Sequence, residues 1–168
     1  MNNIVLIGMP GAGKSSVGVI LAKVLGYQFI DTDLIIQEKE NRLLKDIIEK
    51  EGLEEFMAIE DRVNSSILAD RAVISPGGSV VYCKNAMEHF REIGTVIYIK
   101  LTFETVEKRL GNIKKRGVVL RKGQNLKDLY IERCPLYEKY AHITVNAENM
   151  DLEEVMETIK MEYEAFTS

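Results

Sequence analysis

The sequence predicts an α/β fold in which a parallel sheet is flanked by helices, and three observations support this prediction. Short apolar runs alternate along the chain with longer stretches of helical periodicity. The first run leads directly into a glycine-rich loop at 8–15, and a later run at 72–75 leads into a second glycine-containing loop at 76–79. The 168 residues contain no linker-like tract, so we expect residues 1–168 to form a single domain.

The first strand and the first helix are expected on either side of the glycine-rich loop. Residues 4–7 form the continuous apolar run Ile-Val-Leu-Ile, which predicts a strand. Apolar residues return at helical spacing between 16 and 25, so a helix is expected there with its N-terminus facing the loop. Those apolar positions are Val17, Ile20, Leu21, Val24 and Leu25.

The rest of the chain continues this alternation. Further strands are expected at 27–30, 72–75, 95–101 and 142–146. Helical patterning covers 34–48, 55–69, 84–92, 103–111, 126–140 and the chain from Asp151 onward. The segment 112–125 is polar, basic and contains glycine, and we interpret it as a mobile lid. Ligands of parallel sheets bind beyond the carboxyl ends of the strands, so the loops at 8–15, 31–33 and 76–79 are expected to converge.

Composition narrows the class of partner. The chain has 22 Lys plus Arg against 26 Asp plus Glu and a net charge of −4, which gives no general reason to bind nucleic acid or an anionic membrane. Cys83 and Cys134 lie far apart without metal-type spacing, and no apolar segment approaches the roughly 20 residues that span a bilayer. We therefore expect a cytoplasmic protein without a nucleic acid or membrane partner. The motifs described below point to a small-molecule substrate as the partner, and a monomer is compatible with the sequence.

Residues 8–15 read Gly-Met-Pro-Gly-Ala-Gly-Lys-Ser, a complete G-x-x-x-x-G-K-S phosphate-binding loop. The glycines allow the backbone amides to point inward, Lys14 supplies a cation and Ser15 a hydroxyl for Mg²⁺. The alternative is a glycine-rich turn with an incidental lysine, but the full pattern stands between a strand and a helix, as a nucleotide site requires. Nucleotide contacts are expected from Gly11, Ala12, Gly13, Lys14, Ser15 and Ser16.

Asp31 and Asp33 follow the second strand and are candidates for chemistry. If the chain stays extended, residues two apart point to the same face, so one carboxylate can serve the water shell of a metal and the other the phosphoryl acceptor. For Asp33 the alternative is a structural role, because an Asp between a strand and a helix is commonly an N-cap.

Arginines gather in the expected lid and its flanks, where they are candidates for neutralising a transferred phosphoryl group or for binding an anionic substrate. They are Arg109, Arg116, Arg121 and Arg133. Alternatively, these arginines are ordinary surface side chains that are exposed to solvent.

With these features in place, nearly the whole chain resembles the shikimate kinases, small nucleoside-monophosphate-kinase-like enzymes that transfer the γ-phosphoryl group of ATP to the 3-hydroxyl of shikimate. The resemblance rests on residues 8–15, Asp31-Thr32-Asp33, Phe56 with Glu60, Gly77-Gly78, Arg109, Arg116 and residues 133–137. It implies a three-layer P-loop kinase fold with a five-stranded parallel sheet and a mobile lid at about 112–125. It also implies ATP and Mg²⁺ as cofactors and a role in aromatic amino acid biosynthesis.

The resemblance assigns roles on the nucleotide side. Lys14 and Arg116 would stabilise charge on the phosphoryl group, as catalytic residues. Ser15 would ligate Mg²⁺, Asp31 would act on it through bound water, and Arg109 would lie against the adenine.

On the acceptor side, the resemblance makes Asp33 the residue that orients or deprotonates the acceptor hydroxyl. The N–H groups around Gly77 and Gly78 would meet substrate hydroxyls, and Arg133 would pair with the substrate carboxylate.

The chain departs from the family pattern at three places. Met57 stands where family members usually have an Arg, so one arm of the carboxylate clamp is missing, and Arg62 lies on a different part of the helix surface. The triple glycine becomes Pro76-Gly77-Gly78 followed by Ser79, and the lid motif becomes Arg-Gly-Val-Val at 116–119.

These departures leave two alternatives to a shikimate kinase. One is a kinase of another hydroxylated metabolite, since Met57 makes the substrate site less polar and favours a ligand with less negative charge. The other is a nucleotide-binding module without catalytic activity.

Overall fold

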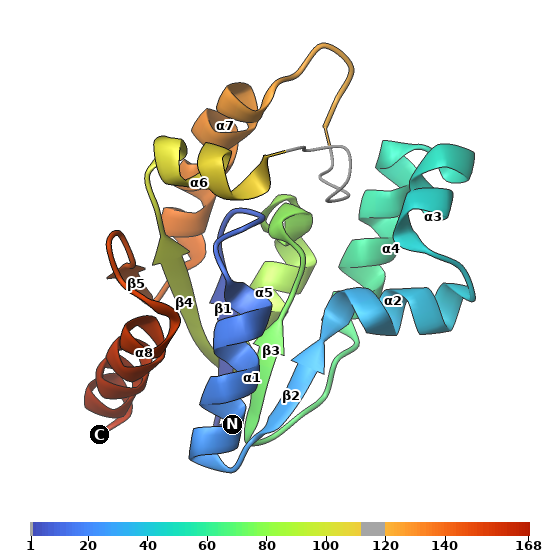
Figure 1. Cartoon of the computed structure of the whole chain (residues 1–168). Coiled ribbons are helices and arrows are strands. Elements are labelled where there is room, and N and C mark those ends of the chain that lie inside the picture. The colour runs from blue at the N-terminus through green and yellow to red at the C-terminus, as the bar shows by residue number, and fades with distance from the viewer. Residues whose placement is uncertain (1, 112–119) are drawn as a thin grey trace.

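The computed structural model describes residues 2–111 and 120–168, and within them it confirms the expected five-stranded parallel sheet, in the order β2-β3-β1-β4-β5 (Figure 1). The strands are β1 (Asn3–Ile7), β2 (Gln28–Asp31), β3 (Ala72–Ser75), β4 (Gly94–Lys100) and β5 (Ile143–Asn146). The helices are α1 (Lys14–Leu25), α2 (Thr32–Glu40), α3 (Leu44–Glu51), α4 (Leu53–Ser65), α5 (Lys84–Ile93), α6 (Phe103–Leu110), α7 (Leu126–Tyr140) and α8 (Leu152–Thr167), with a 3₁₀ helix η1 (Gly78–Tyr82).

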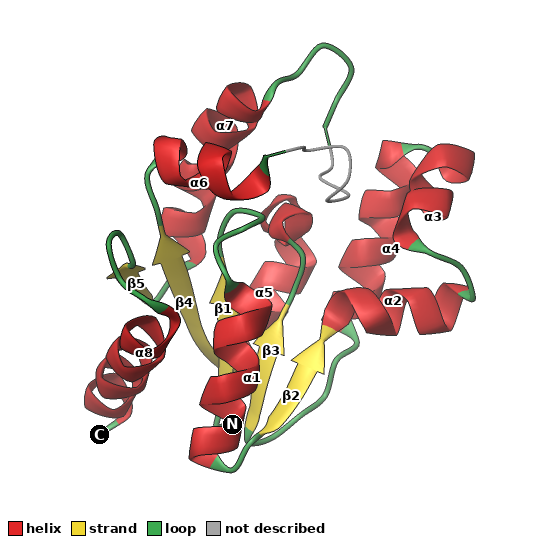
Figure 2. Cartoon of the chain, in the orientation of Figure 1, coloured by secondary structure: helices red, strands yellow, loops and turns green. Residues whose placement is uncertain are grey.

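Helices cover both faces of the sheet (Figure 2). Helix α1 packs against α8 and β3, and these two helices lie in front of the sheet in Figure 1. Helix α5 packs against α4 and β4 and lies behind it. This gives the three layers expected of an α/β fold.

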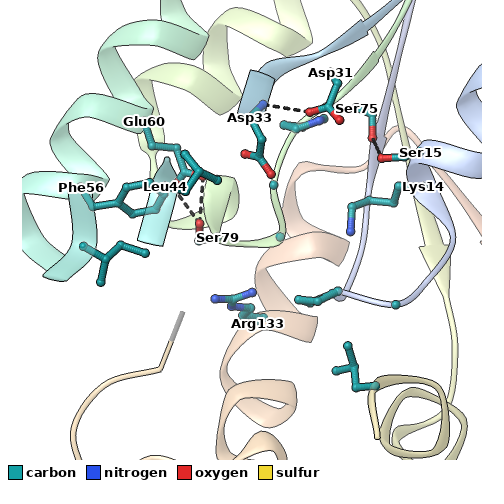
Figure 3. Close-up of a pocket in the computed structure, with 17 residues that line it drawn as sticks. Lys14, Ser15, Asp31, Asp33, Leu44, Phe56, Glu60, Ser75, Ser79 and Arg133 are labelled. Atoms are coloured by element: carbon teal, nitrogen blue, oxygen red, sulfur yellow. Dashed lines mark hydrogen bonds between the residues drawn. The ribbon is translucent and has the colours of Figure 1, made fainter. Parts of the chain in front are cut away.

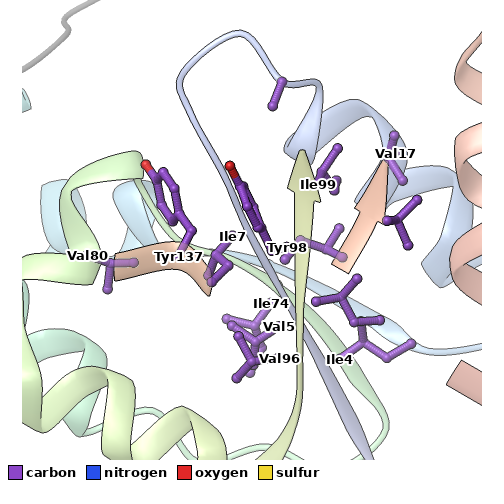
Figure 4. Packing of buried hydrophobic residues seen from close by; sticks show 14 of the residues in the cluster. Ile4, Val5, Ile7, Val17, Ile74, Val80, Val96, Tyr98, Ile99 and Tyr137 are labelled. Carbon is purple, nitrogen blue, oxygen red and sulfur yellow. The ribbon is translucent and has the colours of Figure 1, made fainter. Parts of the chain in front are cut away.

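The apolar run at 4–7 belongs to the central strand β1, which pairs in parallel with β3 on one side and β4 on the other. All of β1 is buried, because helices cover it on both faces. Figure 4 shows Ile4, Val5 and Ile7 among their core neighbours. On one face the core includes the rings of Tyr98 and Tyr137, which stack with their centroids 5.1 Å apart.

The helical patterning at 34–48 is two helices, not one. Asn41 adopts a left-handed conformation with φ of 55°, which ends α2 and lets the chain turn into α3. Together with α4, these helices bury a second apolar cluster formed by Ile36, Ile47, Phe56, Ile59 and Val63. The helix expected over 55–69 ends at Ser65, and residues 78–82 form η1, a 3₁₀ helix that no pattern predicted.

Most of the expected lid and its Arg116 lie outside the described residues, which resume at Leu120. Helix α7 then begins at a capping box, in which Asn125 and Asp128 each accept a hydrogen bond from the other's backbone N–H. Across the described ranges, the helices are too short or too polar to cross a membrane.

Asn3 joins three segments at the amino end of the sheet, although sequence analysis did not single it out. Its side chain is fully buried, donates hydrogen bonds to the carbonyls of Ala69 (2.8 Å) and Ile93 (2.9 Å), and accepts one from the N–H of Ala72 (3.0 Å). It thus satisfies backbone groups before β3 and before β4 that would otherwise be buried without partners.

We predict that Asn3→Ala lowers the free energy of unfolding by about 2–4 kcal/mol, because buried polar backbone groups lose their partners. Chemical denaturation of the purified variant measures this. Asn85→Ala is the control, since Asn85 makes one exposed hydrogen bond to Asp61. Equal stability of the two variants would contradict the role given to Asn3.

Candidate active site

A cavity of about 290 Å³ lies at the carboxyl ends of β1, β2 and β3, where the three loops converge as expected (Figure 3). Helices α3, α4 and α7 close it on the other sides. Its lining residues are Pro10, Gly11, Lys14, Ser15, Asp31, Asp33, Leu44, Ile48, Phe56, Glu60, Ser75, Pro76, Gly77, Gly78, Ser79, Leu110 and Arg133.

The loop at 8–15 connects β1 to α1 with the backbone that its glycines allow. Gly11 and Gly13 have φ of 82° and 87°, values that side chains disfavour. A Cβ on Gly8 would lie 2.8 Å from the carbonyl oxygen of Ile99. Helix α1 begins at Lys14 without a side-chain cap, so its first N–H groups remain available to an anion.

Lys14 folds back over this loop. Its Nζ donates hydrogen bonds to the carbonyl oxygens of Gly8 (2.9 Å) and Met9 (3.0 Å). Burial of the ammonium lowers the pKa of Lys14 to about 8, and the nearby carboxylate of Asp33 opposes this shift. A bound polyphosphate would favour the charged form of Lys14 more strongly than the two carbonyls do.

Asp31 and Asp33 both line the cavity, but not on one extended segment. The chain turns into α2 at Thr32, and Asp31 is the N-cap, with its Oδ1 accepting a hydrogen bond from the N–H of Asp33 at 3.0 Å. The capping role considered for Asp33 therefore belongs to Asp31. Burial, with a smaller contribution from the charge of Asp31, raises the pKa of Asp33 to about 6.

Gly77 and Gly78 bring the backbone close to two charged side chains. A Cβ on Gly77 would lie 3.0 Å from Oδ1 of Asp33, and one on Gly78 would lie 2.9 Å from Nη1 of Arg133. Arg133 is 1% exposed and projects from α7, while its guanidinium carbon lies 5.3 Å from the ring centre of Tyr82. The site therefore places Asp33 beside Gly77 and Arg133 beside Gly78.

Of three other predicted residues, Ser15 lines the cavity, whereas Arg109 and Met57 are not among the described residues that line it. Arg109 reaches from α6 to the phosphate loop, with its Nη1 3.5 Å from the carbonyl oxygen of Gly11. Ser15 has its Oγ 3.4 Å from Oγ of Ser75. Met57 is half-buried and is not one of the residues lining the cavity in the described part of the chain.

The remaining arginines point elsewhere. Arg62 is largely exposed and pairs with Glu40 at 3.7 Å, so it does not replace the missing arginine at position 57. Arg121 pairs with Glu132 at 2.7 Å. Of the arginines that the structure describes, Arg133 is the one that lines the cavity.

Sequence reasoning missed a contact between two lining residues. Glu60 served only to identify the family, and Ser79 only as a departure from its glycine run. In the structure the Ser79 hydroxyl donates to the buried Glu60 carboxyl at 2.8 and 2.9 Å (Figure 3). No local signal links residues 19 positions apart, so this pair emerges only from the fold.

Comparison with known proteins decides the family. A family model described as shikimate kinase matches residues 10–164. The chain belongs to the shikimate kinase family. The shikimate kinase of Sulfurihydrogenibium sp. (strain YO3AOP1) is 34% identical over 160 residues, which cover 95% of this chain and 96% of that protein.

Solved structures of the family share the fold over almost the whole chain. The shikimate kinase from Acinetobacter baumannii in complex with shikimate has a TM-score of 0.88 and 30% identity, covering 98% of this chain and 94% of that one. The shikimate kinase from Aquifex aeolicus vf5 has a TM-score of 0.84 and 32% identity, covering 98% of each chain.

We predict that affinity for ATP falls as the pH rises through about 8, because the lowered pKa of Lys14 makes the free protein lose this cation there. Titration calorimetry between pH 7 and 9 measures the effect. Lys14→Met should bind weakly and should lack this pH dependence, whereas Lys23→Met, on the same helix, should behave as the unmodified chain. A pH dependence that survives in Lys14→Met would contradict the assignment.

Proposed function

We propose that the chain transfers the γ-phosphoryl group of ATP to the 3-hydroxyl of shikimate. The observation that carries this proposal is that one cavity is lined by Lys14 of the phosphate loop and also by Asp33 and Arg133. Phosphoryl transfer needs mainly positive charge around the phosphate and an oriented acceptor, and this arrangement supplies both. Membership of the shikimate kinase family supports the proposal.

On the donor side, the amides of residues 8–15 and the N-terminus of α1 bind the phosphates of ATP. Lys14 exchanges its two carbonyl partners for phosphate oxygens, which are stronger acceptors because they carry charge. We place Arg109 at the adenine, beside the loop that it contacts. Arg116 supplies a further cation to the phosphoryl group, as the resemblance implies.

The donor set next to the loop suits Mg²⁺. Ser15 offers a hydroxyl and Asp31 a carboxylate, both hard oxygen donors. Within the described residues no group of three or more His, Cys, Asp or Glu could hold a metal ion. We propose that Ser15 directly, and Asp31 through water, hold Mg²⁺ together with ATP; when bound, the ion neutralises charge on the phosphates.

On the acceptor side, Asp33 orients the attacking hydroxyl and accepts its proton. The pKa of about 6 lets the carboxyl remain ionised at neutral pH and keeps it more basic than an exposed Asp. Arg133 binds the carboxylate of shikimate, and the backbone N–H groups of Gly77 and Gly78 meet its hydroxyls. Met57 leaves the α4 side of the acceptor site without a guanidinium.

The direct test is release of ADP in the presence of ATP, Mg²⁺ and shikimate. We expect turnover that depends on shikimate. The alternative acceptor, another hydroxylated metabolite with less negative charge, is favoured by Met57 and would be revealed by a panel of polyols, hydroxy acids and amino alcohols. Nucleotide binding without turnover on any acceptor would point to a non-catalytic module.

We predict that kcat/KM for shikimate falls as the pH is lowered through about 6, because protonated Asp33 cannot accept the proton. Asp33→Asn should reduce kcat at pH 8 by about 100-fold or more and remove this acid limb. Asp70→Asn is the control, because Asp70 is exposed and does not line the cavity. An unchanged acid limb in Asp33→Asn would assign the titration to another group.

We predict that Arg133→Gln raises KM for shikimate by about 10- to 100-fold, the loss expected for one charge-assisted hydrogen bond. KM for ATP should change by less than about twofold, because Arg133 lies on the acceptor side. Steady-state kinetics on both substrates measures this. The control is Arg62→Gln, an exposed residue of α4. An equal rise in both KM values would show that Arg133 does not act on the acceptor.

A further inference from the structure

Glu60 is a buried carboxyl in the wall of the cavity that the proposed reaction does not use. It projects from α4, is 0% exposed and lines the cavity (Figure 3). The ion pairs of residues 2–111 and 120–168 do not include it. Burying an ionised carboxylate costs free energy unless hydrogen bonds or an opposite charge compensate for the lost hydration. The hydrogen-bond partners of Glu60 are therefore important for its burial.

Those partners come from η1 and the residue after it. The Ser79 hydroxyl lies 2.8 Å from Oε1 and 2.9 Å from Oε2 of Glu60. The Cys83 thiol lies 3.7 Å from Oε1 and 3.6 Å from the carbonyl oxygen of Met57. A hydroxyl and a thiol, both uncharged, therefore cover this carboxyl.

Two departures from the family pattern meet at this carboxyl. Met57, where the family usually has Arg, precedes Glu60 by three residues, which places the two about 60° apart around the helix and within reach of each other. Ser79 follows the two remaining glycines of the family's triple glycine, and a glycine would have no hydroxyl to offer. An Arg at position 57 would thus be within reach of Glu60, whereas this chain has Met57 there and a hydroxyl donor to Glu60 at position 79.

Glu60 is also close to the acceptor-orienting carboxyl. A Cβ on Gly77 would lie 3.4 Å from Oε2 of Glu60 and 3.0 Å from Oδ1 of Asp33, so the two carboxyls flank the same glycine. A shift of Glu60 would therefore change the space and the charge next to the acceptor. Holding Glu60 in place is a requirement of the acceptor site, not only of the helix.

We propose that Ser79 is a specificity-determining positioning residue, whose hydroxyl replaces the absent guanidinium at position 57 as the partner of Glu60. The Ser79–Glu60 pair then gives the α4 wall a hydrogen-bonding surface for acceptor hydroxyls in place of a cation for a carboxylate. This inference rests on the proposed function and deepens it. It also accounts for how a family member can lack the arginine and still keep Glu60 buried.

The kinetic test is a double-mutant cycle between positions 57 and 79. Ser79→Ala should raise KM for shikimate by about tenfold and change kcat by less than about threefold, because Glu60 loses its main donor. Met57→Arg should restore KM in the Ser79→Ala background and have a smaller effect alone. Ser66→Ala is the control, since its hydroxyl bonds to Val63 at the exposed end of α4. Ser79→Gly repeats the test if Ser79→Ala folds poorly.

An activity-independent test uses the pH dependence of thermal stability. Burial raises the pKa of Glu60 to about 7 in the folded protein, above the ordinary value of 4.5 expected in the unfolded chain. Protonated Glu60 therefore contributes to the free energy of unfolding below pH 4.5, and this contribution is lost as the pH rises to about 7. The difference between the unmodified chain and Glu60→Gln isolates this contribution. The groups facing Glu60 are Ser79 and Cys83 from η1 and its end, Asp33 from α2 and Arg133 from α7.

In the Ser79→Ala background the loss of stability should extend to higher pH, because Ser79 holds the pKa of Glu60 down. Adding Met57→Arg should reverse this extension. An identical profile with and without Ser79, or a change in KM by Met57→Arg that is the same in both backgrounds, would overturn the inference. Failure of the unmodified chain to phosphorylate shikimate would instead reject the proposed function. The stability profiles would still test whether Ser79 is the hydrogen-bond partner of Glu60.

Discussion

The parallel pairing of β2, β3 and β1 is the constraint on which the site depends. Because these strands run in the same direction, their carboxyl ends lie at one edge of the sheet, and each strand delivers its following residues to the same cavity. Strand β1 delivers the phosphate loop, β2 delivers Asp31 and β3 delivers the Gly77-Gly78 turn. The register that sets Ile4 opposite Val73 thus brings the phosphate loop and the Gly77-Gly78 turn to the same edge of the sheet.

Burial is the common cause of the charge properties at this edge. It lowers the pKa of Lys14 and raises those of Asp33 and Glu60, so each group is less strongly held in its charged form than it would be in water. The charges are nevertheless complementary, with Lys14 near Asp33 and Arg133 beside Gly78. A phosphate placed beside Lys14 and a carboxylate placed beside Arg133 would complete them. These charges support the proposed binding of ATP and of an anionic acceptor in one site.

The sequence was sufficient for features that depend on local pattern. The apolar run at 4–7 and the glycines after it predict a strand, a tight loop and a helix, and the structure confirms all three. Local pattern fails where a single residue changes direction, as when Asn41 splits one helical stretch into α2 and α3. It fails also where the chain turns at Thr32, which makes Asp31 the helix cap and rotates Asp33 away from the extended geometry.

Contacts between distant segments could not be predicted from the sequence, for a different reason. Asn3 bonds to Ala69 and Ile93, and Ser79 to Glu60, through side chains whose own neighbours in sequence give no signal. The loss of an arginine at Met57 was visible, but its consequence depends on which group it leaves behind. The fold shows that Ser79 hydrogen-bonds to Glu60, one turn of α4 beyond Met57, and this contact is the basis of the proposed role of Ser79.

The most direct test of the account is a crystal structure of the protein with shikimate and Mg²⁺-bound ADP. The account predicts the diphosphate in the loop at 8–15, with the 3-hydroxyl of shikimate hydrogen-bonded to Asp33 and its carboxylate on Arg133. Shikimate bound away from these two residues, or a nucleotide bound outside the loop, would contradict it.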